Sequence, residues 1–134
     1  MSHWLGVVCR DHVQRATRLG IAQLGHGKRG GLARLAAGDR LVYYSPRTSL
    51  RDGEPLQAFT ALGEVADDEI WQADEGDFQP WRRRVDYLPD AVETPIRSLS
   101  LDLTAQPGWG IHLRRGLLPL TDGDFAAIHA AMRP

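Results

Sequence analysis

Cysteine and lysine are the scarcest reactive residues in this sequence, and each occurs once. Because Cys9 is the only cysteine, an internal disulfide is excluded and a reducing, cytoplasmic compartment is the default expectation. A single cysteine provides no zinc knuckle, and the five histidines have neither HxH nor HExxH spacing, which argues against a metal site. We therefore expect a protein without a metal or any other cofactor.

Long apolar runs are also missing. No run approaches the roughly 18 consecutive apolar residues of a membrane span, and the first residues lack the basic and apolar regions of a signal peptide. These absences predict a protein that makes no contact with a membrane. The length of 134 residues is enough for one full core, so we expect a single domain over residues 1–134.

Charge is distributed unevenly, although the formal net charge is only −1. Residues 1–51 contain nine basic and two acidic residues, a net charge of +7, whereas residues 52–134 contain seven and fifteen, a net charge of −8. Such segregation either creates one basic surface or cancels across the fold. All basic residues except Lys28 are arginines, which suit planar contacts with phosphates and bases.

Alternating apolar and β-branched patterns predict five strands. They cover residues 4–9, 41–44, 57–65, 81–88 and 109–113. Turn residues between the second and third of these predict an antiparallel hairpin over residues 40–65. The strand at 41–44 is apolar on both faces, which places it at the centre of a sheet or barrel, and Pro46 should end it.

Helix signals accompany these strands. Asp11 is an N-cap for a helix over residues 12–19, which Gly20 should end. Residues 32–35 form one helical turn, and Thr121 caps a final helix with three apolar residues on one face. Several mostly antiparallel strands with peripheral helices predict an α+β domain that closes as a small open barrel. The acidic residues 66–77 are expected to form an exposed loop.

Two segments could contact an anionic ligand. The glycine-rich residues 25–31 include a histidine and two cations, and glycines allow the backbone to approach a ligand closely. Their spacing is not that of a P-loop, and a flexible connector is the alternative. The second segment follows the central strand, where Ser45, Arg47 and Thr48 place two hydroxyl groups and a cation in a row.

Signals for catalysis are weak. Cys9 and His12 are three residues apart at the end of a strand, but a cysteine among apolar neighbours is typical of an inert core residue. Ser45 has no Gly-x-Ser-x-Gly elbow around it, and most carboxylates fall in the acidic loop. We expect no catalytic residues.

Contact with nucleic acid has better support, because cations flank aromatic side chains. Aromatic faces stack a splayed base while cations hold its phosphates. The cations are Lys28, Arg29, Arg47, Arg82, Arg83 and Arg84, and the aromatic residues are Tyr44, Phe59, Trp71 and Trp81. The alternative is that the rings are core residues and the arginines form a solvated face.

Six segments, taken in order, resemble the EVE domain family. They are QLGHGK at 23–28, residues 38–47 ending in YYSPR, FTALG at 59–63, WRRRV at 81–85, TPI at 94–96 and residues 109–116. EVE domains belong to the PUA-like superfamily, together with YTH and ASCH domains. The resemblance therefore implies a PUA-like pseudobarrel of five or six mostly antiparallel strands surrounded by short helices.

The resemblance also implies a pocket for a modified base, because YTH relatives hold N6-methyladenine in an aromatic cage and EVE domains are linked to modified cytosines. Carried over residue by residue, this base pocket comprises Cys9, Arg10, His12, Gln23, His26, Gly27, Tyr44, Ser45, Pro46 and Trp71. Phosphate contacts fall on Lys28, Arg47, Arg82 and Arg84. Stacking falls to Tyr44 and Trp71. Edge reading falls to His12, Gln23 and Ser45.

The resulting hypothesis is a non-catalytic module, monomeric or weakly dimeric, that reads a modified base in DNA or RNA. The alternative is a small ASCH-like amidohydrolase acting on a modified nucleoside, with Lys28 as its lysine but without an evident acidic partner. A third alternative, a protein-interaction module, predicts an exposed apolar patch rather than a basic cleft.

Overall fold

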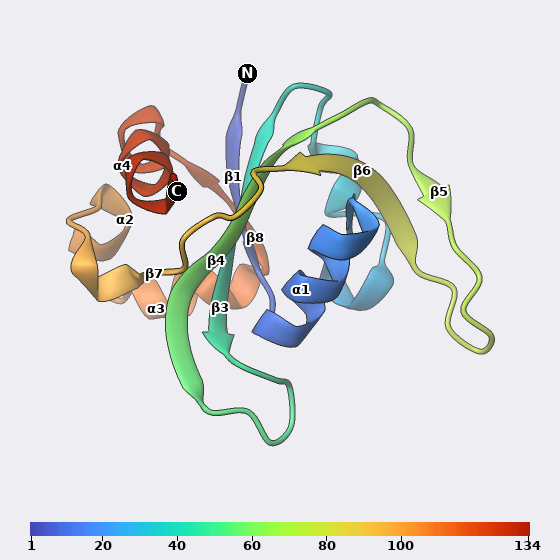
Figure 1. Cartoon of the computed structure of the whole chain (residues 1–134), viewed down its shortest axis with the longest axis horizontal. Coiled ribbons are helices and arrows are strands. Elements are labelled where there is room, and N and C mark those ends of the chain that lie inside the picture. Colours follow the sequence, from blue (N-terminus) through green and yellow to red (C-terminus); the bar gives the residue numbers. More distant parts are fainter.

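One strongly curled sheet organises the fold, with helices on both of its sides (Figure 1). A computed structural model describes all residues, 1–134. The strands are β1 (His3–Val7), β2 (Ile21–Ala22), β3 (Arg40–Arg47), β4 (Pro55–Val65), β5 (Trp71–Gln72), β6 (Trp81–Tyr87), β7 (Thr94–Pro95) and β8 (Leu117–Leu120). The α-helices are α1 (Arg10–Leu19), α2 (Asp102–Ala105), α3 (Trp109–His112) and α4 (Asp122–Met132), and the 3₁₀ turns are η1 (Gly25–Gly27), η2 (Leu32–Arg34), η3 (Ile96–Ser98) and η4 (Leu113–Arg115). The sheet order is β2-β6-β4-β3-β1-β8, with β5 paired to β6 and β7 paired to β4. The expected α+β pseudobarrel is confirmed.

The predicted hairpin of β3 and β4 is the spine of the sheet. The two strands pair antiparallel from Arg40 to Arg47. β3 continues through Pro46, although the proline predicts its end. The proline is tolerated because β1 pairs with β3 only as far as Tyr44, and the pairing with β4 shifts register after Ser45. The missing N–H therefore interrupts no regular ladder.

β1 lies inside the sheet, and its pairing differs from the expected pattern. It pairs in parallel with β3 and antiparallel with β8, and sequence patterns do not predict β8. Residues 109–113, predicted as a strand, are helical instead. Trp109 and Leu113 both pack against the core. A spacing of four residues puts two side chains on one face of a strand as well as of a helix, so the apolar pattern of this segment fits either element.

Two apolar cores lie on opposite sides of the sheet, because successive residues of β3 point to opposite faces. Val42 and Tyr44 belong to the core that also contains residues of α2 and α4. Leu41 and Tyr43 belong to the core that contains residues of α1. Figure 1 shows α1 on one side of the sheet and α2, α3 and α4 on the other.

The last helix begins where it is predicted, and the first helix ends where it is predicted but begins two residues earlier. α4 begins at its predicted cap, because the Thr121 hydroxyl accepts a hydrogen bond from the backbone N–H of Asp124. α1 ends at Gly20, whose φ of 67° is left-handed, but its N-cap is Cys9 rather than Asp11. Asp11 lies in the first turn, where a carboxylate interacts favourably with the helix dipole. None of the helices combines the length and the apolar character needed to span a membrane.

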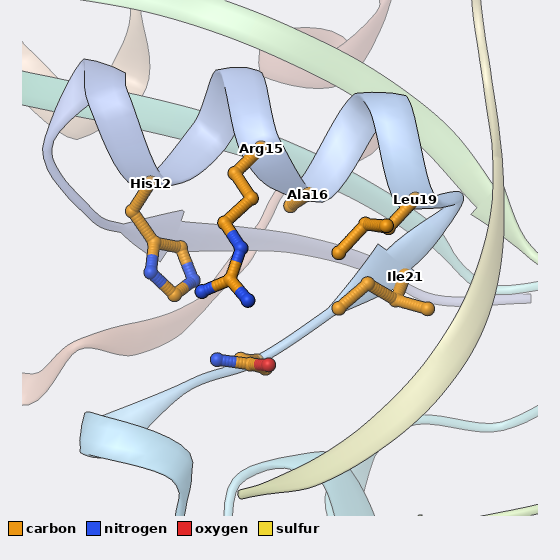
Figure 2. A pocket seen from close by; sticks show the side chains of 6 residues that line it. His12, Arg15, Ala16, Leu19 and Ile21 are labelled. Atoms are coloured by element: carbon orange, nitrogen blue, oxygen red, sulfur yellow. The ribbon is translucent and has the colours of Figure 1, made fainter. Parts of the chain in front are cut away.

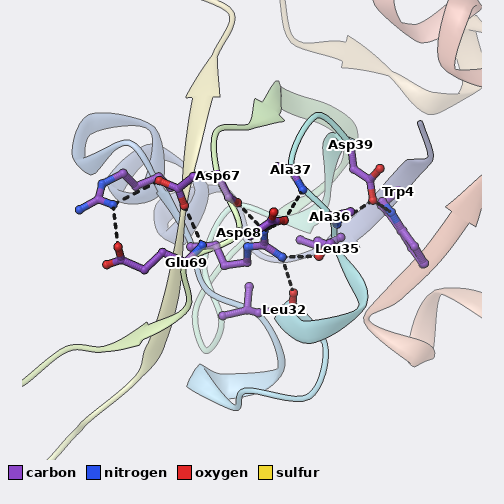
Figure 3. A network of polar contacts seen from close by, with 11 residues as sticks. Trp4, Leu32, Leu35, Ala36, Ala37, Asp39, Asp67, Asp68 and Glu69 are labelled. Atoms are coloured by element: carbon purple, nitrogen blue, oxygen red, sulfur yellow. Dashed lines mark hydrogen bonds and ion pairs between the residues drawn. The ribbon is translucent and has the colours of Figure 1, made fainter.

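β6 carries a buried arginine that connects three parts of the chain. Arg83 is 1% exposed, and its guanidinium donates hydrogen bonds to the carbonyls of Leu32, Leu35 and Asp67. Figure 3 shows these bonds together with Asp68, whose carboxylate lies 3.6 Å from Nη2. Arg83 thus fastens η2 and the loop after β4 to the sheet, and it is a core residue rather than part of a solvated face.

Candidate functional site

Five polar side chains meet beside α1, β2 and β6. We call them the polar cluster: His12, Arg15, Gln23, Glu75 and Arg82. Figure 2 shows His12 and Arg15 pointing the same way from α1, toward the strand that contains Ile21. Gln23 is 4% exposed, and its Oε1 accepts a hydrogen bond of 2.5 Å from Nε of Arg82. The fold thus brings together three of the predicted site residues, His12, Gln23 and Arg82.

The chain between β5 and β6 folds back against this cluster as an acidic hairpin, residues 73–80. Backbone hydrogen bonds close it, including one of 2.8 Å from the Glu75 N–H to the Phe78 carbonyl. Glu75 Oε2 accepts a hydrogen bond from Arg15 and lies 3.1 Å from Nη2 of Arg82. Residues 66–77, expected as a solvated loop, therefore include a strand and a carboxylate that joins two arginines.

The cluster's electrostatics favour a neutral histidine beside a charged glutamate. Burial lowers the pKa of His12 most, and the neighbouring Arg15 and Arg82 lower it further, while the Gln23 backbone and Glu75 oppose them only in part. The hydrogen bond from Arg15 lowers the pKa of Glu75, and both guanidinium charges add to this effect against a smaller desolvation penalty. A neutral imidazole has one donor and one acceptor, so His12 can both donate and accept a hydrogen bond.

The glycine loop, residues 25–31, packs against the same acidic hairpin. Gly27 has a φ of 84°, and a Cβ at this position would lie 2.8 Å from both Phe78 Cζ and Pro80 Cβ. Only glycine combines this φ with so close an approach. The backbone at Gly27 therefore receives the hairpin in this structure, where the sequence predicts that it receives a base. The neighbouring His26 and Lys28 are exposed.

The polar cluster encloses little space with the hairpin in this position. The cavity beside His12, Arg15 and Gln23 has a volume of about 10 Å³, which is about what one water molecule needs. A larger groove of about 440 Å³ lies elsewhere and is lined by Thr17, Arg18, Thr60, Ala61, Tyr87, Leu88, Pro89, Asp90 and Ala91. None of the predicted site residues lines this larger groove.

Tyr44 and Ser45 do not face an opening, and the roles predicted for them are wrong. Tyr44 is 2% exposed and packs edge-on against Phe59, with ring centres 5.8 Å apart. Ser45 is fully buried, with its Oγ 2.8 Å from Oγ1 of Thr60. The physical reason is that the sheet is covered on both sides, so both faces of β3 are interior.

The other residues predicted near the ends of β1 and β3 are engaged within the protein. Nε of Arg10 donates a hydrogen bond of 2.9 Å to Glu93, and Arg47 donates to a backbone carbonyl in the β3–β4 turn. Cys9 and Pro46 are half-buried. Since none of these residues lines the cavity at the polar cluster, the fold divides the predicted pocket into two groups.

Trp71 borders the polar cluster, because it pairs with Arg82 across β5 and β6. The guanidinium of Arg84 lies over its ring, 5.0 Å from the ring centre, and so covers one face that the sequence assigns to a base. Arg84 also lies 3.3 Å from Asp67 and 3.7 Å from Glu69. The phosphate role predicted for Arg84 thus competes with two carboxylates of the protein itself.

Sequence reasoning missed two members of the polar cluster. Helical spacing could have identified Arg15, because a residue three positions after His12 lies on the same face of a helix. Glu75 had no such signal, because it is 60 residues away from Arg15 in a stretch that is acidic throughout.

The lysine of the amidohydrolase alternative lacks the partner that this alternative requires. Lys28 is exposed and takes part in none of the ion pairs of the chain. No three or more His, Cys, Asp or Glu side chains are grouped so that they could hold a metal ion. Nothing in the arrangement of these residues indicates catalysis.

Comparison with known proteins places this geometry in a family. The family model described as EVE domain matches residues 2–131. A UPF0310 protein from Renibacterium salmoninarum is 49% identical over 130 residues, 96% of this chain and 94% of that protein. One from Mycolicibacterium gilvum is 49% identical over 136 residues, 98% of this chain and 96% of that protein.

Solved structures agree on the fold. A hypothetical protein from Leishmania major has a TM-score of 0.58 at 12% identity, over 97% of this chain and 93% of that one. An NMR structure of a protein from Rhodopseudomonas palustris has a TM-score of 0.57 at 15% identity, over 98% and 93%. On the sequence match along nearly its whole length, the chain belongs to the EVE domain family.

Proposed function

We propose that this EVE domain binds nucleic acid through the face that contains the glycine loop and the acidic hairpin, and reads a modified base at the polar cluster. One observation carries the proposal. Polar side chains from three separate segments, His12, Gln23 and Arg82, converge beside a loop of exposed cations.

The polar cluster offers the groups that a base edge needs. The neutral imidazole of His12 and the amide of Gln23 each supply a donor and an acceptor, and a base taken out of its stack exposes its edge to such groups. Trp71 provides a ring beside them once Arg84 gives up its place on that ring. A buried methyl group adds about 1 kcal/mol, so the expected preference for a methylated base is about fivefold.

Phosphate contacts fall on the exposed cations of the glycine loop. Lys28 and Arg29 are exposed, and neither pairs with a carboxylate of the protein. Arg29 lies 5.8 Å from the ring centre of Trp81, so its guanidinium is held at the surface. Arg47 and Arg84 are weaker candidates because both have partners within the protein.

A binding panel tests this proposal. Short single-stranded DNA and RNA oligonucleotides, plain or carrying a methylated or hydroxymethylated base, are titrated against the protein at several salt concentrations. Lys28→Ala should weaken binding to plain and modified strands equally and reduce the salt slope by about 1, whereas His12→Asn should change the ratio between them. Arg133→Ala removes an exposed cation after α4 and serves as the control.

Two results would count against the proposal. Equal affinity for modified and plain strands throughout the panel would exclude base reading, even if the strands bind. An equal loss of affinity in Lys28→Ala and Arg133→Ala would mean that binding follows overall charge and not this face.

A further inference from the structure

We propose that Arg15 and Arg82 form a site for a phosphate group of the nucleic acid, and that Glu75 fills this site in the unbound protein as an internal competitor. The inference rests on the proposed function, because it takes the bound polymer to be a nucleic acid. It adds a residue that the sequence analysis missed, Arg15, and a control device, the acidic hairpin at residues 73–80.

The geometry at Glu75 is that of an occupied anion site. Guanidinium groups from α1 and β6 converge on one carboxylate oxygen, Oε2 of Glu75. Nη2 of Arg82 is buried and has no hydrogen-bond partner, although that oxygen lies 3.1 Å away. A carboxylate therefore leaves a donor of this site unused. A phosphate group has more oxygens, and arginine forks match them with paired hydrogen bonds.

The space at the cluster requires the hairpin to move before a base can enter. A cavity of about 10 Å³ holds one water molecule, whereas pockets for small organic ligands measure roughly 300–1,000 Å³. The contacts that keep the hairpin in place are few. They are the Glu75 ion pairs, the packing of Phe78 and Pro80 on Gly27, the pairing between β5 and β6, and a hydrogen bond of 3.1 Å from Nε2 of Gln72 to the Gln79 carbonyl.

Charge makes the hairpin and the nucleic acid exclude one another. The hairpin contains three acidic residues and no basic residue. Phe78, at its turn, is 44% exposed. A phosphate that takes the place of the Glu75 carboxylate gains both guanidinium groups and drives the negatively charged hairpin away from the polymer. The same step uncovers His12 and Gln23, so phosphate binding and base reading are coupled.

A matched pair of variants tests the inference. Glu75→Gln removes the competing charge, whereas Asp77→Asn removes one charge from the same hairpin at an exposed residue without an ion pair. Glu75→Gln should bind a plain single-stranded oligonucleotide about tenfold more tightly than wild type if about one molecule in ten is open before the change. Asp77→Asn should change the affinity less than twofold, and adding Arg15→Ala to Glu75→Gln should abolish the gain.

Pyrophosphate titration and hydrogen exchange separate this inference from the proposed function. Glu75→Gln should bind pyrophosphate more tightly than Asp77→Asn does, and the amide of residue 75, bonded to the Phe78 carbonyl, should exchange faster. These results would support the anion site even if no oligonucleotide binds. The absence of oligonucleotide binding would contradict only the proposed function. Equal pyrophosphate affinity and equal exchange in the two variants would overturn the inference, whatever the oligonucleotides do.

Discussion

Replacing Arg83 by methionine should destabilise the domain by about 2–4 kcal/mol. Methionine fills most of the arginine's volume, so the main loss is hydrogen bonding to the carbonyls of Leu35 and Asp67, because the Leu32 carbonyl keeps the hydrogen bond from the backbone N–H of Leu35. Each buried carbonyl left without a partner costs about 1–3 kcal/mol, and relief from burying a charge offsets part of the sum. A domain of this kind has a free energy of unfolding of about 5–15 kcal/mol. The variant should therefore still fold but unfold at a lower urea concentration than the wild type.

Urea unfolding followed by circular dichroism measures this loss, and the adjacent arginine supplies the control. Arg84→Met removes a side chain that is 53% exposed and pairs with Asp67 and Glu69, and exposed pairs of this kind contribute about 0–1 kcal/mol. Arg83→Lys keeps the positive charge but loses the forked guanidinium group, so its loss in free energy of unfolding should lie between those of Arg83→Met and Arg84→Met. If Arg83→Met cost less than 1 kcal/mol, or no more than Arg84→Met, the account of Arg83 as a structural fastener would be refuted.

Two further predictions concern the candidate site. The pKa of His12 is lowered from its usual 6.5, so the unfolded chain binds more protons just below that pH and the free energy of unfolding falls on acidification from pH 7 toward pH 5. His12→Gln should flatten this dependence in melts at a series of pH values, and an unchanged slope would contradict it. Gly25 and Gly27 both have positive φ, but only at Gly27 would a Cβ clash with the hairpin. Gly25→Ala should therefore cost about 1 kcal/mol and Gly27→Ala about 1 kcal/mol more, because opening the hairpin relieves the clash and a tenfold equilibrium is worth about 1.4 kcal/mol. Equal losses in chemical denaturation would argue against hairpin packing.

Features with a local signal were predictable from the sequence. The turn residues between β3 and β4, the left-handed Gly20 and the Thr121 cap each depend on a few neighbouring residues, and each is found where the sequence places it. The parallel pairing of β1 with β3 has no such signal, because it joins strands that are separated by a helix, β2 and the glycine loop. β8 was missed because Pro119 weakens its strand pattern, yet an edge strand tolerates a proline.

The candidate site was predictable only where one element carried the information. A residue pattern shows that β3 is apolar on both faces, but it cannot show that helices cover both, which is why Tyr44 and Ser45 were misplaced. His12, Gln23 and Arg82 come together as a set of predicted residues, while their link to Glu75 depends on how the acidic hairpin folds back. Contacts between side chains of segments that are far apart in the sequence have no local signal, so they could not be predicted from it.

The place of β1 between β3 and β8 determines when the sheet can be completed during synthesis. Residues 3–7 can pair with β3 early, but their second edge stays open until residues 117–120 have left the ribosome. An open strand edge is a template on which another chain can add a strand. Pairing of residues 117–120 with residues 3–6 therefore closes this edge of β1 and leaves β8 as the edge strand of the sheet.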